Sequence, residues 1–181
     1  GWMGSAEQIE SCLDYFKSWP DALAVVDPVM GDHGKPYQTY TPDMCQWMAS
    51  LAAAADLITP NLTEASILLG EPYPAAPLRQ FEAKRMLARL SEKGPRLVTI
   101  TGVEMADGHV SNLGYDRDRG EYWRVDCNYV PASYPGTGDL FASVLVGALL
   151  RGDSLPMAIE RASRFLEIAV RSSFTYGGAT R

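Results

Sequence analysis

The chain has 181 residues, 46% hydrophobic and 21% charged, which is typical of one globular domain with a full-sized core. A net charge of −6 without any run of Lys or Arg argues against a nucleic-acid-binding surface. The three cysteines form no C-x-x-C pair, and no apolar run reaches membrane-spanning length. We therefore expect a cytoplasmic protein without a disulfide framework, a zinc site or a membrane span.

The N-terminal half alternates between helical patterns and short apolar strands. Helices are predicted after Ser5, after Thr41 and over the residues that end at Gly70. Residues 23–26 and 57–58 are wholly apolar, as expected for strands that are buried on both faces. Such a pattern is typical of a parallel sheet.

The C-terminal half continues this alternation and adds an antiparallel hairpin. The predicted elements are a helix over residues 78–90, a strand at 96–101, a hairpin from 110–115 and 121–125, a helix after residue 136 and a long helix at 155–174. Strands that alternate with helices indicate a parallel sheet covered on both faces. We expect a single α/β domain over residues 1–181.

Polar residues follow three of the predicted strands. Asp27, Thr59 and Thr101 are each placed at the carboxyl end of a strand. In open α/β sheets, ligands bind beyond the carboxyl ends of the strands. We therefore expect the binding site along this edge.

A glycine-rich turn precedes the helix that begins near residue 137. Gly136, Thr137 and Gly138 lead into an apolar helix with Asp139 in its first turn. Unpaired N–H groups and the helix dipole at such a start favour an anion, and a neighbouring carboxylate suggests phosphoryl transfer. Helix capping by Asp139 is the alternative reading. The turn lacks the Lys-Ser/Thr of a Walker A loop and the third Gly of a dinucleotide fingerprint.

Two further acidic segments have two readings each. Asp27 and Asp32 flank one strand-end loop, where they serve either the turn or nucleotide phosphates through Mg²⁺ and water. Asn61 and Glu64 match a capping box, and the same geometry would orient a hydrated Mg²⁺. Capping and metal support are compatible, so both readings stay open.

Three motifs taken together resemble one known family. Residues 27–32, 59–64 and 136–139, in this order and spacing, are similar to the pyridoxal/pyridoxamine kinase branch of the ribokinase-like superfamily. Residues 1–5 also resemble the Gly-Tyr segment of that branch, with Trp2 in place of the aromatic residue. The resemblance implies a three-layer α/β fold with a mostly parallel sheet flanked by helices. The chain begins without Met, and we expect the family's N-terminal third and closing strand to be absent from it.

The resemblance implies ATP-dependent phosphorylation of the hydroxymethyl group of pyridoxal, pyridoxine or pyridoxamine, which supplies pyridoxal 5'-phosphate in vitamin B6 salvage. Asp139 would be the catalytic base, Gly136 and Gly138 would form the anion hole, and Trp2 would contact the vitamer with Asp139.

The remaining assignments also come from the resemblance. Mg²⁺ would be held by Asp32 and Glu64 with Asn61 nearby, a monovalent cation stays open, and the family is usually homodimeric. The ATP-binding residues implied are Asp27, Tyr37, Thr59, Asn61, Glu64, Thr101, Arg124, Val125, Asp126, Cys127 and Thr137.

Two other functions remain as alternatives. Hydroxymethylpyrimidine kinase is a close relative with the same Asp-Pro-Val strand end. The resemblance implies that the residue after Gly-Thr-Gly distinguishes the two: Asp139 favours the pyridoxal branch, whereas a Cys would favour the other. A nucleotide-binding fragment without turnover is the second alternative.

Overall fold

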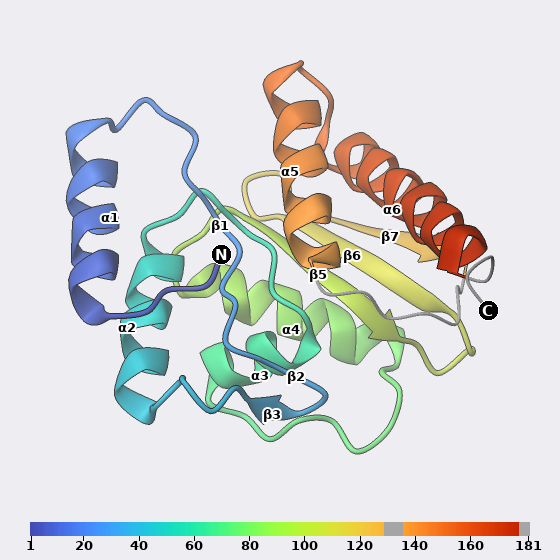
Figure 1. Cartoon of the computed structure of the whole chain (residues 1–181), viewed down its shortest axis with the longest axis horizontal. Helices are drawn as coiled ribbons and strands as arrows, with labels where there is room; N and C mark the ends of the chain where they lie inside the picture. Colours follow the sequence, from blue (N-terminus) through green and yellow to red (C-terminus); the bar gives the residue numbers. More distant parts are fainter. Residues whose placement is uncertain (129–135, 178–181) are drawn as a thin grey trace.

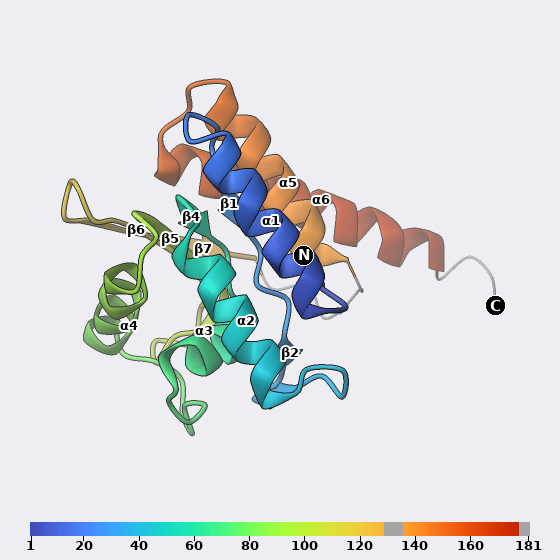
Figure 2. The same ribbon diagram turned by 90° about the vertical axis from the view of Figure 1, so that its left-hand side faces the viewer.

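The computed structural model describes residues 1–128 and 136–177, with side chains described up to residue 173. A five-stranded sheet lies between two layers of helices (Figures 1 and 2). Its strands, in spatial order, are β1 (Val25–Val26), β4 (Leu57–Ile58), β5 (Leu97–Glu104), β6 (Val110–Asp116) and β7 (Glu121–Cys127). The expected three-layer α/β fold is confirmed.

The sheet is mixed. β1, β4 and β5 pair in parallel, so that Val26, Ile58 and Val98 lie in register. β5, β6 and β7 pair antiparallel, which confirms the predicted hairpin. The parallel part is therefore the part whose carboxyl edge is expected to bind ligands.

Helices cover both faces of the sheet. One layer contains α1 (Ala6–Ser18), α2 (Pro42–Ala53), α3 (Leu62–Leu69) and α4 (Gln80–Glu92). The other contains α5 (Thr137–Leu150) and α6 (Leu155–Gly177). Among the described residues, no helix is both long and apolar enough to cross a membrane.

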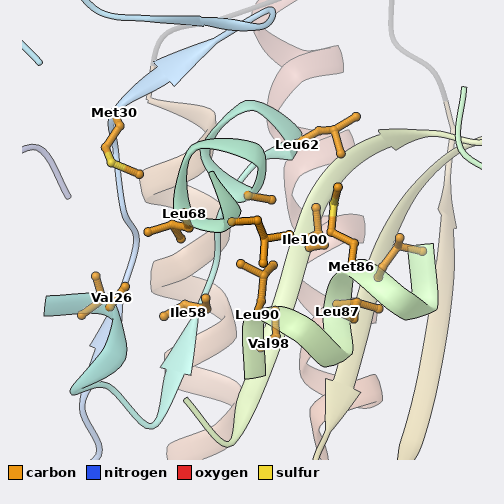
Figure 3. Close-up of a cluster of buried hydrophobic side chains, with 14 of the residues drawn as sticks. Val26, Met30, Ile58, Leu62, Leu68, Met86, Leu87, Leu90, Val98 and Ile100 are labelled. Atoms are coloured by element: carbon orange, nitrogen blue, oxygen red, sulfur yellow. The ribbon is translucent and has the colours of Figure 1, made fainter. Parts of the chain in front are cut away.

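The short parallel strands are wholly apolar because they contribute to two cores. Successive side chains of a strand point to opposite faces of the sheet. Ile58 and Val98 therefore join the core under α3 and α4 (Figure 3), whereas Leu57 and Leu97 pack with α5 and α6. A strand that alternates polar and apolar residues would place polar side chains in one of these two cores.

Strand β5 differs from the prediction. It continues past Thr101 to Glu104, with a register shift between Ile100 and Val103. The side chain of Asn112 on β6 accepts a hydrogen bond from Gly102 N at 2.9 Å, at a glycine with φ +65°. The predicted strand end at Thr101 is thus wrong: Thr101 lies at a bulge inside β5.

The segment that follows Asp27 in the strand-end loop contains a hairpin that was not predicted. β2 (Gly31–Asp32) and β3 (Lys35–Pro36) form a two-stranded hairpin beside α3 (Figure 1). His33 and Gly34, at its tip, have φ values of +49° and +76°, as in the tight turns that suit a two-residue hairpin.

Gly70 ends α3 in the left-handed conformation, with φ +68°, as its position after the apolar run predicts. We expect Gly70→Ala to lower the free energy of unfolding by about 1–2 kcal/mol, because Ala is strained there. Gly147→Ala is the matched control, since Gly147 lies within the C-terminal half of α5, and a Cβ at either glycine meets no atom within 4 Å. The control should raise stability by about 0.5–1 kcal/mol. Equal effects in urea unfolding would contradict this account.

Candidate active site

A cavity of about 650 Å³ opens beyond the carboxyl ends of β1 and β4. The start of α3, the β2–β3 hairpin, the bulged part of β5 and the start of α5 all contribute to its wall. The described residues that line it are Asp27, Val29, Asp32, His33, Tyr37, Thr59, Asn61, Leu62, Thr63, Glu64, Tyr73, Thr101, Gly102, Glu104, Gly136, Thr137, Gly138 and Asp139.

The start of α5 provides an anion-binding geometry. Gly136 precedes the helix with φ +88°, a conformation that glycine adopts without strain. The first intrahelical hydrogen bond runs from Leu140 N to Gly136 O at 3.1 Å. The N–H groups of Thr137, Gly138 and Asp139 precede that bond, so they have no acceptor within the helix and can bind an anion. Asp139 is exposed in this first turn.

Asp27 faces this helix start. Its Oδ1 accepts a hydrogen bond from the Thr59 hydroxyl at 3.1 Å, and a Cβ placed on Gly138 would lie 3.9 Å from its Oδ2. Oδ2 is buried and has no hydrogen-bond partner among the described residues. Burial raises the pKa of Asp27, and the charge of Asp139 raises it further. An unpaired buried carboxylate oxygen fits a site that receives a cation or a water bound to one.

Glu64 connects α3 to the strand-end loop. Its Oε2 accepts from Asn61 N at 2.8 Å, its Oε1 accepts from Met30 N at 3.1 Å, and Asn61 Oδ1 accepts from Glu64 N at 2.9 Å. The predicted capping box is therefore confirmed. Glu64 is only 4% exposed, and burial raises its pKa to about 8 against the effect of the two N–H donors, with the charge of Asp27 adding to the rise.

The described part of the cavity wall is acidic. It contains five acidic side chains, Asp27, Asp32, Glu64, Glu104 and Asp139, and neither Lys nor Arg. A nucleotide phosphate chain would meet repulsion there unless cations accompany it. No cluster of three or more His, Cys, Asp or Glu suited to a metal occurs in the described part of the chain. The donor set thus fits Mg²⁺ that keeps most of its waters and few direct carboxylate ligands.

The structure brings most of the predicted site residues together. Around this cavity lie Asp27, Asp32, Tyr37, Thr59, Asn61, Glu64, Thr101, Gly136, Thr137, Gly138 and Asp139. Thr101 still lines the cavity despite the bulge. Its N–H donates to Pro60 O at 3.0 Å, and its backbone forms a parallel β-bridge with Asn61.

Five predicted residues are not among those that line the cavity. Trp2 is 55% exposed, and its Nε1 donates to Thr39 Oγ1 at 3.4 Å. On β7, Arg124 binds Asp107 through both terminal nitrogens at 2.7 and 3.0 Å, and its neighbours Val125, Asp126 and Cys127 also lie outside the lining. Their roles toward vitamer and nucleotide stay predictions.

Other lining residues were not predicted. Val29, His33 and Leu62 lie within or beside the recognised motifs, whereas Tyr73 lies between two predicted helices and was assigned no function. Gly102 and Glu104 reach the cavity only because β5 continues past its predicted end. Thr63 lies inside the Asn61–Glu64 motif, and only its position there could have indicated a role.

Comparisons with known proteins identify the family of the chain. The family model for phosphomethylpyrimidine kinase matches residues 1–181. A pyridoxal kinase of Deinococcus radiodurans is 34% identical over 144 residues, which are 77% of this chain and 48% of that protein.

Two solved structures extend the comparison. A Bacteroides thetaiotaomicron protein, provisionally assigned as a phosphomethylpyrimidine kinase, is 46% identical with a TM-score of 0.92, over 97% of this chain and 61% of its own; one of its crystal forms contains pyridoxal. A Leishmania donovani pyridoxal kinase, in complex with ADP and pyridoxamine, is 27% identical with a TM-score of 0.81, over 96% of this chain and 63% of its own. The chain spans about half the length of the curated relatives that it matches.

Proposed function

Because the chain belongs to the phosphomethylpyrimidine kinase family, we propose that it carries the phosphoryl-transfer site of a kinase that uses ATP to phosphorylate the hydroxymethyl group of vitamin B6 compounds. One observation carries this proposal: Asp139 stands in the first turn of α5, beside free helical N–H groups and facing Asp27, in a single cavity. We further propose that residues 1–181 belong to one kinase domain.

The roles follow from the chemistry of the groups. The N–H groups that begin α5 hold the transferred phosphoryl group and stabilise the charge on its oxygens. Asp139 accepts the proton of the attacking hydroxyl as the bond to phosphorus forms. Asp27, Asp32 and Glu64 would hold Mg²⁺ through its waters, and the ion would neutralise phosphate charge. Thr59 orients Asp27 by donating its hydroxyl hydrogen.

Pyridoxal-type substrates are supported by relatives named as pyridoxal kinases and by solved relatives that contain pyridoxal or pyridoxamine. Asp139, which follows Gly-Thr-Gly, supports the same choice. The description of the matching family favours a second candidate, hydroxymethylpyrimidine kinase. A nucleotide-binding fragment remains the third.

The wider assignments are part of the same proposal. The three cysteines are free thiols, which suits a reducing cytoplasmic setting. We also propose a homodimer, a vitamer contact by Trp2 and a nucleotide contact by residues 124–127.

A substrate panel tests the proposal. Purified protein with Mg²⁺-ATP should release ADP and form a phosphorylated product with pyridoxal, pyridoxine or pyridoxamine, at a higher kcat/KM than with hydroxymethylpyrimidine. Faster transfer to hydroxymethylpyrimidine would select the second candidate. Nucleotide binding without transfer to either class would select the non-catalytic fragment.

A further inference from the structure

The β2–β3 hairpin places Asp32 and His33 at the wall of the cavity. The two strands of the hairpin lie so close that a Cβ on Gly31 would be 2.4 Å from the backbone oxygen of Lys35. At its tip, Asp32 Oδ1 accepts from His33 N at 2.8 Å. The location of the Asp32 carboxylate therefore depends on how the whole hairpin is held.

Three side chains from the first turn of α3 and its cap bind the backbone of this segment. Asn61 Nδ2 donates to Gly31 O at 2.9 Å, and Glu64 Oε1 accepts from Met30 N at 3.1 Å. Both bonds hold the base of the hairpin. The third bond holds its tip: Thr63 Oγ1 accepts from Gly34 N at 2.8 Å.

Thr63 differs from its two neighbours in α3. Asn61 and Glu64 also cap the helix, so a change at either residue alters both the cap and the hairpin. Thr63 takes no part in the capping box and is 4% exposed, so its hydroxyl is held in one place. Across the tip, the ring of Tyr73 lies where a Cβ on Gly34 would meet it at 3.1 Å. The tip is thus held between Thr63 and Tyr73.

We propose that Thr63 is a positioning residue: its hydroxyl fixes the tip of the β2–β3 hairpin and thereby holds Asp32 where Mg²⁺-nucleotide binds. The link to nucleotide rests on the proposed function, whereas the link to the hairpin rests on the hydrogen bond alone. The alternative is that Thr63 only satisfies one N–H group and contributes nothing beyond stability.

Hydrogen exchange of the protein without ligand tests the first link. Thr63→Val removes the acceptor of the Gly34 amide, while Val has nearly the same shape as Thr. Hydrogen exchange of the Gly34 amide should therefore become roughly 3- to 10-fold faster. Thr63→Ser keeps a hydroxyl and should restore most of the protection. Ser66→Ala is the matched control, because Ser66 is equally buried in α3 and its hydroxyl donates to Leu62 O within the helix. Unchanged Gly34 exchange in Thr63→Val would overturn the proposal.

Calorimetric binding of Mg²⁺-ADP tests the second link. Thr63→Val should raise its Kd by roughly 3- to 10-fold, Thr63→Ser by much less, and Ser66→Ala not at all. If Thr63 acts through Asp32, Thr63→Val should raise the Kd little further in a protein that already carries Asp32→Asn. Additive effects, or an unchanged Kd, would contradict the positioning role.

A second variant guards against loss of folding in Thr63→Val. Gly34→Ala keeps the Thr63 hydroxyl but strains the tip, since its φ is +76° and its Cβ meets Tyr73. It should also weaken Mg²⁺-ADP binding, and an unchanged Kd would count against the proposal. If the protein binds Mg²⁺-ADP in a way that depends on Thr63 but transfers no phosphate, only the proposed function is contradicted. If the protein transfers phosphate and its Mg²⁺-ADP binding does not depend on Thr63, only this inference is contradicted.

Discussion

Replacing Asp139 with Asn is expected to lower kcat by about 10²–10⁴-fold, the usual contribution of a general base. Asn keeps the shape of the side chain but cannot accept the hydroxyl proton at neutral pH. Asp139 is exposed in the first turn of α5, so stability should change little. The KM for ATP should also stay close to that of the wild type, because the N–H groups that bind phosphate belong to the backbone.

Asp43→Asn is the matched control for this substitution. Asp43 is likewise an exposed carboxylate in the first turn of a helix, α2, and it is not among the residues that line the cavity. It shares any effect of a first-turn charge on the helix dipole, worth about 0.3–1 kcal/mol. If both variants lose the same small amount of activity, Asp139 is only a helix cap and the catalytic assignment is wrong.

The free energy of unfolding is expected to fall as the pH rises from about 5 to 8. Burial raises the pKa of Glu64 in the folded protein to about 8, from an ordinary value of 4.5. Between these values the folded state binds more protons at Glu64 than the unfolded state, so stability decreases with pH. The slope for one such proton approaches about 1.4 kcal/mol per pH unit. Urea unfolding at a series of pH values measures it.

Glu64→Gln should flatten this pH dependence, because the titrating group is removed. It should also lower stability at pH 5 by about 1–3 kcal/mol, since Gln has one acceptor oxygen for the two N–H groups that Glu64 binds. The matched control is Glu82→Gln: Glu82 occupies the same capping-box position in α4 but is far more exposed, and its pKa is lowered by its hydrogen bond to Arg79. A lowered pKa affects stability only in more acidic solution, so the slope between pH 5 and 8 should persist in Glu82→Gln. A flat wild-type profile would contradict the raised pKa of buried Glu64.

Those parts of the fold that depend on neighbouring residues were predictable from the sequence. The Asn61–Glu64 cap and the Gly70 stop lie within one short segment, and the structure confirms both. The hairpin of β6 and β7 was predictable for the same reason. The apolar strand at residues 57–58 was also found, because both of its faces are buried.

Features set by contacts distant in sequence were not predictable. The bulge at Thr101 depends on the side chain of Asn112 on the next strand, so the sequence around Thr101 alone predicted an early end. The same extension of β5 brings Glu104 to the cavity. Tyr73 reaches the cavity from an irregular loop, where no periodic pattern indicates which side chain turns inward.

The ion pairs of Arg124 on β7 show another limit of sequence reasoning. The resemblance to known kinases assigned residues 124–127 to the nucleotide, and that assignment stays a prediction. In the structure Arg124 forms ion pairs with Asp107 and Asp126. Asp126 lies on the same strand and Asp107 on a turn between β5 and β6. No sequence spacing indicates in advance that Arg124 pairs with them.

The most direct test of the central claim is a crystal structure of the protein with a non-hydrolysable Mg²⁺-ATP analogue and pyridoxal. We expect the terminal phosphate at the N–H groups of residues 137–139, with the hydroxymethyl oxygen within hydrogen-bond distance of the Asp139 carboxylate and Mg²⁺ waters on the Asp27 side. A terminal phosphate bound elsewhere, or a vitamer whose hydroxyl lies away from Asp139, would contradict it.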